Sequence, residues 1–332
     1  MAQIKTGIWT TLGFYAVLWI PLASITSLSA YLVLCTNLPQ LVYSRAAVNI
    51  YFDCLALVDQ DYVYSAKPGP CILNNLEYRT VLHHDRQGFR NTGATTAMQA
   101  DIVLLGDSHT HGFGVNGDQT FAAILESRYG RKTKNLGMGS YATLRELAAL
   151  QMHGSGEKVV VIQYCDNDAE ENLQSLSIGP EPFKAMVRQR WLQVAGHYRL
   201  QKEQGAWLVV RELARRLLRL QFQSKQAFAA QLLQRDISSE ADAFAQLLAR
   251  FEKALQGKRL VIFESSGHGF SHPEFKSAFQ SAIKKHNPAL DASVLDSTGF
   301  LGAKDYYFLD EHLNVSGHVR VADRLNAALL PN

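Results

Sequence analysis

The chain has 332 residues, of which 47% are hydrophobic and 19% are charged, and its formal net charge is +3. This composition is typical of a globular protein with a substantial core, in one large domain or two ordinary ones. The small net charge, without a basic block interleaved with aromatic residues, argues against a nucleic-acid-binding protein. The histidines do not show the usual zinc spacings, so no metal and no cofactor is expected.

An apolar stretch, residues 7–35, follows a short tail at residues 1–6 and contains no charged residue. A membrane-spanning helix needs about 20 apolar residues. Trp9 and Tyr31 lie near the two ends, as interfacial aromatic residues do. We therefore expect an uncleaved transmembrane anchor. A cleaved signal peptide, which normally has a shorter apolar core and a clear small-residue cleavage site, and a buried helix of a soluble protein are the alternatives.

Residues 36–100 are expected to be an irregular linker, because prolines and glycines interrupt them. Cys54 and Cys71 could form a disulfide in an oxidising compartment, and two separate buried thiols are the alternative. Segment 85–91 reads D-R-Q-G-F-R-N and has the character of a compact turn. It is either a solvated turn or the lip of a binding site, at which Arg90 would face an anionic or sugar substrate.

Strands and helices alternate regularly from residue 101 to residue 332. Candidate strands lie at 102–105, 134–136, 158–164, 259–264 and 293–295, and helical patterns lie near 120–128, 143–152, 273–285 and 316–330. Strands that alternate with helices indicate a parallel, doubly wound sheet.

The section at about 182–256 departs from this rhythm and is expected to be a helical insertion. Apolar residues recur there at helical spacing with arginines between them. Its basic amphipathic piece, 210–219, could lie on an anionic membrane surface or against a partner helix. The alternative is a helix packed on its own domain with a solvated basic face.

Segment 101–114, D-I-V-L-L-G-D-S-H-T-H-G-F-G, predicts a buried strand followed by a sharp turn into a helix. Ser108 would then be exposed at the carboxyl end of the sheet, where open α/β sheets bind ligands. It is either a nucleophile or the N-cap of an ordinary helix. Asp107 and His109, which flank it, are candidate substrate contacts at the rim or plain turn residues.

Asp310 and His312 lie two residues apart just before the last predicted helix. In an extended loop, such residues point the same way. Asp310 can accept the Nδ1–H of His312, which leaves Nε2 free to accept a proton. A serine hydroxyl is a weak nucleophile without such a base.

Two further segments follow predicted strands of the same sheet. Asn167 comes after strand 158–164, and its amide could donate a hydrogen bond to an oxyanion. Segment 135–141, N-L-G-M-G-S-Y, is rich in small residues, so its backbone N–H groups could approach a ligand closely.

Together these four segments resemble the SGNH hydrolase superfamily of GDSL-like esterases. The similarity lies in G-D-S-H-T-H-G at 106–112, G-M-G-S-Y at 137–141, N-D at 167–168 and D-x-H-x-N-x-x-G-H at 310–318. The resemblance covers about 101–330 and implies a flavodoxin-like three-layer α/β/α sandwich with about five parallel strands.

The resemblance also implies residue roles. Ser108 would be the nucleophile, His312 the general base and Asp310 the acid that orients it, and Asn167 and the Ser108 N–H would bind the oxyanion. The second segment of the family usually ends in a glycine that supplies a third donor. Here Ser140 stands at that place and Gly139 precedes it, so the N–H is kept but the conformational freedom of glycine is not.

The function implied is a membrane-anchored serine esterase or O-acyltransferase. It would act on acyl esters of a carbohydrate or lipid, and the expected acyl group is acetyl. Segment 85–91 is similar to membrane-anchored proteins of cell-surface polysaccharide modification. This similarity and the two cysteines favour a catalytic domain outside the cytoplasm, in the periplasm. The alternative is a catalytically inactive SGNH-fold scaffold, or a subunit of a membrane complex with a membrane-protein partner.

Overall fold

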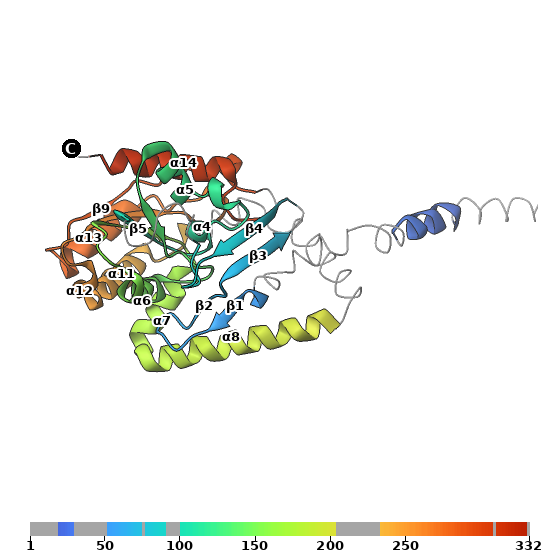
Figure 1. Ribbon diagram of the computed structural model, residues 1–332, viewed down its shortest axis with the longest axis horizontal. Coiled ribbons are helices and arrows are strands. Elements are labelled where there is room, and N and C mark those ends of the chain that lie inside the picture. The colour runs from blue at the N-terminus through green and yellow to red at the C-terminus, as the bar shows by residue number, and fades with distance from the viewer. Residues whose placement is uncertain are drawn as a thin grey trace, which may run out of the picture.

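A five-stranded parallel sheet forms the centre of the molecule (Figure 1). The computed structural model describes residues 19–29, 52–74, 77–90, 100–203, 233–307 and 310–330. The strand order is β6-β5-β7-β8-β9, with β5 (Ile102–Leu105), β6 (Thr133–Asn135), β7 (Val159–Tyr164), β8 (Arg259–Glu264) and β9 (Ala292–Val294). The predicted parallel α/β sheet is thus confirmed. Its apolar strands are buried because helices cover both faces.

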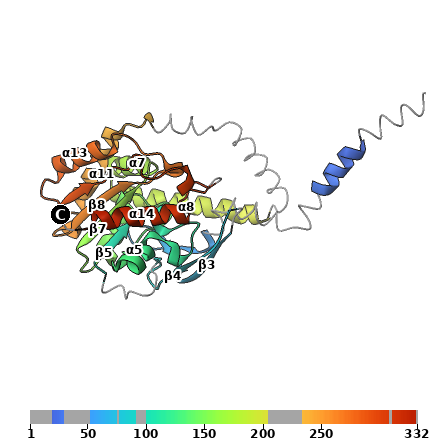
Figure 2. The same ribbon diagram turned by 90° about the horizontal axis from the view of Figure 1, so that it is seen from above.

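Successive residues of each strand point to opposite faces of the sheet and enter two separate cores. Val103 and Leu105 pack with the helices of one layer, and Ile102 and Leu104 pack with those of the other. Figure 2, the view from above, shows a helical layer in front of the strands. The first layer holds α6 (Thr143–His153), α11 (Ile237–Arg250) and α13 (Phe275–His286), and the second holds α5 (Phe121–Tyr129) and α14 (Val315–Ala328). The shorter helical segments are α4 (Ser108–His111), η2 (Gly117–Gln119), α12 (Glu252–Leu255), η3 (Gly267–Gly269) and η4 (Ala303–Asp305).

The expected irregular linker instead contains two antiparallel strand pairs. Strands β1 (Leu55–Leu57) and β2 (Tyr64–Ala66) form one pair, and β3 (Gly69–Asn74) and β4 (Arg79–His84) form the other. These strands were not expected from the sequence, because the inward face of β4 carries Thr80 and His84 beside Leu82. The alternation of apolar and polar residues that is typical of a half-buried strand is therefore absent. A disulfide joins Cys54 to Cys71 and ties the two pairs together.

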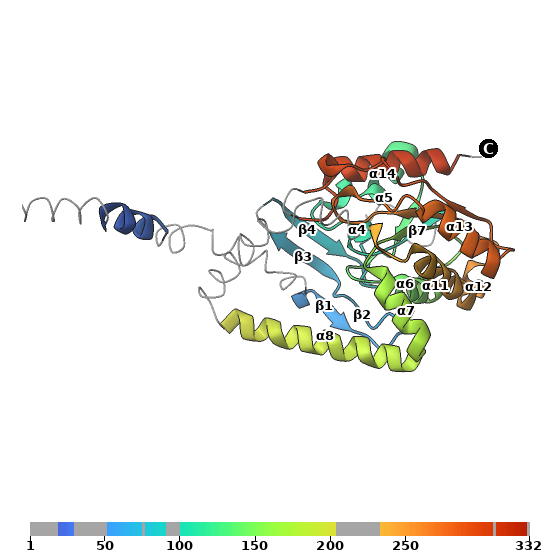
Figure 3. The same cartoon turned by 180° about the vertical axis from the view of Figure 1, so that it is seen from behind.

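The helical section after β7 divides into two parts. Helices α7 (Asp168–Ile178) and α8 (Pro180–Glu203) come first, and α8 runs along β1 and β2 (Figure 3). Ion pairs from Lys184 to Asp61 (3.3 Å) and from Arg188 to Asp59 (3.5 Å) link α8 to the segment between those strands. In the second part, α11 lies in the core layer and packs against α13. The basic piece 210–219 lies outside the described residues.

Residues 19–29 of the expected anchor are helical, and their side chains are exposed. The rest of the stretch 7–35 lies outside the described residues. Among the helices that the structure describes, none is both long enough and apolar enough to cross a bilayer.

Candidate active site

Ser108 is the first residue of the short helix α4, directly after strand β5. Asp107 is the N-cap of this helix, and its Oδ1 atom accepts a hydrogen bond from the His109 N–H at 2.9 Å. Gly106 has a φ of 152°, and a Cβ atom there would lie 2.2 Å from Thr110 Oγ1. Only glycine therefore fits at this corner. The segment 106–115, which we call the serine turn, presents the half-buried Ser108 at the carboxyl edge of the sheet.

The loop that carries Asp310 and His312 is closed at its base. Tyr306 and Leu313 form an isolated antiparallel bridge. Asn314 is the N-cap of α14, and its Oδ1 atom accepts hydrogen bonds from two N–H groups of the first turn. Its Nδ2 atom donates to the Tyr306 carbonyl at 3.0 Å. The asparagine of the D-x-H-x-N pattern thus fixes the loop.

Three predicted side chains from opposite ends of the domain meet at the sheet edge. The His312 Nε2 atom lies 2.8 Å from the Ser108 Oγ atom. On the other side of the ring, Nδ1 of His312 is hydrogen-bonded to Oδ1 of Asp310. The His312 backbone N–H donates to the same carboxylate oxygen at 3.1 Å. The arrangement is a hydroxyl–imidazole–carboxylate relay, which can move a proton away from Ser108.

The charge of His312 is set by two opposing effects. Burial favours the neutral imidazole and would lower its pKa, but the Asp310 carboxylate outweighs burial and raises the pKa of His312 to about 9. At neutral pH the ring is therefore mainly an imidazolium whose Nε2–H points at Ser108. It becomes a proton acceptor only in the neutral form, so any base function should increase toward alkaline pH.

The loop after β6 packs closely against the serine turn. The Asn135 side chain donates to the Thr110 carbonyl at 2.8 Å, and the Met138 N–H donates to the Gly106 carbonyl at 3.1 Å. A Cβ atom at Gly137 would lie 2.8 Å from the backbone nitrogen of His111. Small residues here allow the two backbones to lie side by side.

Ser140 occupies the place at which the sequence pattern suggested a missing glycine. Its φ is 61°, so this serine adopts the left-handed conformation that glycine adopts easily. Its carbonyl accepts a hydrogen bond from Arg145, whose guanidinium also pairs with Glu171 at 2.7 Å. The serine thus keeps a glycine-like backbone, held by Arg145.

Candidate oxyanion donors lie on three loops. Within the described residues, the N–H groups of Ser108, Gly139 and Ser140 donate no hydrogen bond. Asn167 lies in an exposed turn after β7, the strand that pairs with β5, and its side chain does not cap α7. The N–H of Ser108 and the Asn167 amide are thus carried on turns that leave the sheet at the same edge.

Arg90 does not face the substrate side, which corrects one of the two interpretations of segment 85–91. The residue is 2% exposed. Its guanidinium donates to the carbonyls of His111 (3.0 Å), Gly112 (2.5 Å) and Val115 (2.6 Å). Arg90 therefore holds the serine turn, because its planar guanidinium presents several N–H donors to these buried carbonyls.

Asp107 and His109 are also not rim residues. They are 1% and 3% exposed, so neither can contact a substrate at the rim. Burial raises the pKa of Asp107, and burial together with the nearby His312 charge lowers the pKa of His109 to about 3. The His109 ring is therefore neutral at physiological pH, and burial shifts the Asp107 carboxyl toward its protonated form.

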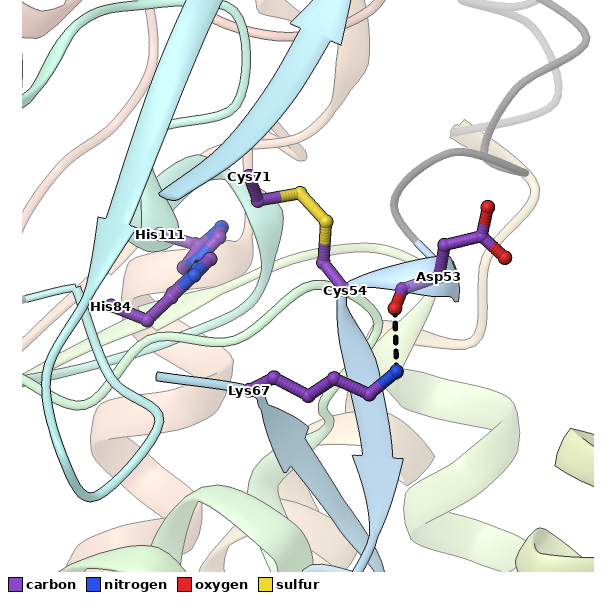
Figure 4. Close-up of a disulfide and its surroundings, with 6 residues drawn as sticks. All are labelled: Asp53, Cys54, Lys67, Cys71, His84 and His111. Carbon is purple, nitrogen blue, oxygen red and sulfur yellow. Dashed lines mark hydrogen bonds between the residues drawn. A yellow bond between two sulfur atoms is a disulfide. The ribbon is translucent and has the colours of Figure 1, made fainter. Parts of the chain in front are cut away.

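His111, the last residue of α4, stacks on His84 of strand β4. The two rings are 5.2 Å apart and nearly parallel, and their Nε2 atoms are separated by 3.0 Å. Burial and the Arg90 charge lower the pKa of His84 to about 4. Figure 4 shows this pair next to the Cys54–Cys71 disulfide. The N-terminal strands therefore contact the serine turn directly.

One group of side chains could hold a metal ion within the described part of the chain. Asp107, His109 and Cys165 each place a ligand atom within 4.8 Å of the others. Burial raises the pKa of the Cys165 thiol, as it does for the Asp107 carboxyl. Both shifts disfavour the anionic forms that bind a metal, so binding would weaken as the pH falls. The relay itself needs no metal.

Sequence reasoning missed Tyr78 and Glu77, which touch the candidate acid. Tyr78 lies 232 positions before Asp310, and its hydroxyl donates to Asp310 Oδ2 at 3.1 Å. The Asp310 N–H donates to Glu77 Oε2 at 3.0 Å. No local pattern marks these two residues, since their partner lies at the other end of the chain.

No known protein-family profile and no curated protein matches the chain. Several solved structures match the chain in part, at low identity and with low TM-scores. A protein of the G-D-S-L lipolytic family from Desulfitobacterium hafniense DCB-2 is 12% identical, with a TM-score of 0.36 over 69% of this chain and 98% of that one. The lipase Lip_vut3 from a goat rumen metagenome is 15% identical, with a TM-score of 0.36 over 70% of this chain and 98% of that one.

A family two carbohydrate esterase from Clostridium thermocellum, solved in complex with cellohexaose, is 12% identical to this chain. The TM-score is 0.37, and the match covers 71% of this chain and 65% of the esterase. Identities and TM-scores this low do not indicate a function. What the site can do is therefore decided by its own geometry.

Proposed function

We propose that the chain is a serine esterase or O-acyltransferase that works through an acyl-enzyme on Ser108. The observation that carries this proposal is the 2.8 Å contact between Ser108 Oγ and His312 Nε2, with the other ring nitrogen bonded to Asp310. A buried structural serine would not need an imidazole oriented by a carboxylate.

In the first half-reaction, the neutral His312 Nε2 accepts the hydroxyl proton while Ser108 Oγ attacks the ester carbonyl carbon. The bond to the alcohol then breaks, and His312 returns the proton to the leaving oxygen. In the second half-reaction, water or a sugar hydroxyl attacks the acyl group and gives its proton to His312. Ser108 leaves and takes that proton back. Hydrolysis and transfer differ only in this second acceptor.

The negative charge on the carbonyl oxygen would be stabilised by the Ser108 N–H, by an N–H of Gly139 or Ser140, and by the Asn167 amide. Removing one such donor from an oxyanion hole costs about 10²- to 10³-fold in kcat. The left-handed Ser140 would keep its N–H in the direction that a glycine would give.

The substrate class that we propose is an acyl ester of a carbohydrate or lipid, with acetyl as the expected acyl group. It is supported by the similarity of segment 85–91 to proteins of cell-surface polysaccharide modification. We also propose that residues 7–35 anchor the chain in a membrane with its catalytic domain in the periplasm. The Cys54–Cys71 disulfide supports an oxidising compartment.

The test is covalent labelling with a fluorophosphonate, followed by intact mass and peptide mapping. We expect one adduct, on Ser108, and none in Ser108→Ala. Ser127, an exposed serine on α5, provides the matched control, because Ser127→Ala should label like the parent chain. Hydrolysis of p-nitrophenyl acetate should be lost in Ser108→Ala and kept in Ser127→Ala. The absence of any adduct would favour the inactive scaffold, and unchanged hydrolysis by Ser108→Ala would place the activity elsewhere.

A further inference from the structure

The β3–β4 hairpin contacts both ends of the relay. At its tip, Tyr78 donates to Asp310 Oδ2 at 3.1 Å, and Glu77 accepts the Asp310 N–H at 3.0 Å. At its other end, His84 lies against His111 of the serine turn. One hairpin therefore contacts the carboxylate and the serine turn, which come from opposite ends of the folded domain.

The Asp310 carboxylate is held at both oxygens. Its Oδ1 atom accepts two N–H groups of His312, from the ring and from the backbone. Its Oδ2 atom accepts the Tyr78 hydroxyl. A carboxylate bonded at one oxygen can rotate about its last bond, whereas one bonded at both keeps its plane fixed. Tyr78 supplies a hydrogen bond to the second oxygen.

The Tyr78 ring is itself fixed by packing. Its centroid lies 4.8 Å from that of Tyr307, whose hydroxyl donates to the Gly114 carbonyl at 2.7 Å. A Cβ atom at Gly114 would lie 2.6 Å from the Tyr307 ring and 3.1 Å from the Tyr78 ring. The glycine of the serine turn therefore leaves the space in which the two rings lie.

The base of the hairpin is tied down as well. Cys71 of β3 is disulfide-bonded to Cys54, which precedes β1, and Lys67 donates to the Asp53 carbonyl at 2.8 Å (Figure 4). Behind β4, Arg90 binds three carbonyls of the serine turn. The hairpin is thus a covalently tethered element with fixed contacts to the site.

We propose that Tyr78 is a positioning residue of the reaction, which holds Asp310 in the plane that orients His312 toward Ser108. This inference rests on the proposed function, because it assigns Tyr78 to the same relay. It also means that the segment before the α/β domain is part of the active site and not a linker.

The test compares Tyr78→Phe with Tyr129→Phe. Tyr129 is a matched control, because its hydroxyl also donates to an aspartate, Asp323, but on the far helices α5 and α14. Removing a hydrogen bond to a charged group costs about 10- to 100-fold. We therefore expect kcat for p-nitrophenyl acetate to fall by about that factor in Tyr78→Phe, with KM little changed, and to stay at the parental value in Tyr129→Phe.

Two readouts separate positioning from packing. A freed carboxylate pairs less well with His312, so the pH midpoint of kcat/KM should move from the alkaline side toward neutral in Tyr78→Phe. The low-field proton resonance of the His312–Asp310 hydrogen bond, assigned by its absence in His312→Ala, should broaden or shift upfield. This second measurement needs no substrate and no turnover.

The outcomes are distinguishable. If the parent chain takes no fluorophosphonate label, the proposed function fails, and an altered resonance in Tyr78→Phe still supports the positioning role. If the parent chain is active and Tyr78→Phe keeps its kcat, its pH midpoint and its resonance, the positioning role is wrong. A midpoint that moves further to the alkaline side with full kcat would also overturn it, since Tyr78 would then only reduce the charge of Asp310.

Discussion

Asp310→Asn is the most informative single change in the site. The asparagine keeps the size of the side chain but removes the charge that raises the pKa of His312 to about 9. Burial is then opposed only by the smaller effects of the Glu311 and Asp107 charges, so the pKa of His312 should fall toward its ordinary value of about 6.5. The amide can also present its NH₂ group to Nδ1 and select the wrong tautomer, which lowers kcat by about 10⁴ in a relay of this kind.

The assay is kcat/KM for p-nitrophenyl acetate, together with the rate of fluorophosphonate inactivation, measured from acid to alkaline pH. The parent chain should gain activity as the pH rises through about 9, because only neutral His312 accepts a proton. In Asp310→Asn the same rise should come at least two pH units earlier, at a much lower plateau. If the midpoint stays near 9 in the variant, the alkaline rise does not come from the His312–Asp310 pair.

The same pair makes a prediction about stability. The pKa of His312 is about 9 in the folded chain and about 6.5 in the unfolded one, a difference of about 3 kcal/mol. Because the folded value is the higher one, the stabilisation is fully present below about pH 6.5 and is lost as the pH rises through about 9. Denaturant unfolding of the parent chain and of Asp310→Asn should therefore differ most at mildly acid pH and converge at alkaline pH.

Two further predictions concern the N-terminal strands. Reduction of the Cys54–Cys71 disulfide, whose partners are 17 positions apart, should lower the free energy of unfolding by about 3 kcal/mol; equal denaturation midpoints with and without reductant would contradict this. Arg90→Lys should cost about 1–3 kcal/mol, because an ammonium group cannot serve all three carbonyls of the serine turn and leaves a buried acceptor unpaired. A thermal midpoint equal to that of the parent chain would show that these three contacts add nothing to the stability of the fold.

The central sheet was predictable because its information is local. Strands β5, β7 and β8 contain short apolar runs, and such runs are typical of a parallel sheet that is covered on both faces. Ser108 was predictable for a related reason, since a glycine and a capping aspartate after an apolar strand define a sharp turn. The pairing of Asp310 with His312 was predictable, because residues two positions apart in an extended loop point the same way and one side chain can orient the other.

The surroundings of the relay were not predictable in this way. One interpretation of Asp107, His109 and Arg90 was that they contact the substrate, but all three are buried. The sequence does not show whether the side chain of a polar residue next to a nucleophile points to the solvent or into the core. The direction is decided by the fit of neighbouring loops, here the close approach of Gly137 to the serine turn.

From the sequence alone, the chain's α/β core, its candidate nucleophile and its acid–base pair could be derived, because each is encoded within a few consecutive residues. Only the tertiary structure revealed that Tyr78 and Glu77 are hydrogen-bonded to Asp310 and that Arg90 binds carbonyls of the serine turn. These contacts join segments up to 233 positions apart. Pairings at such distances leave no local pattern, because they depend on how the strands, helices and loops pack together.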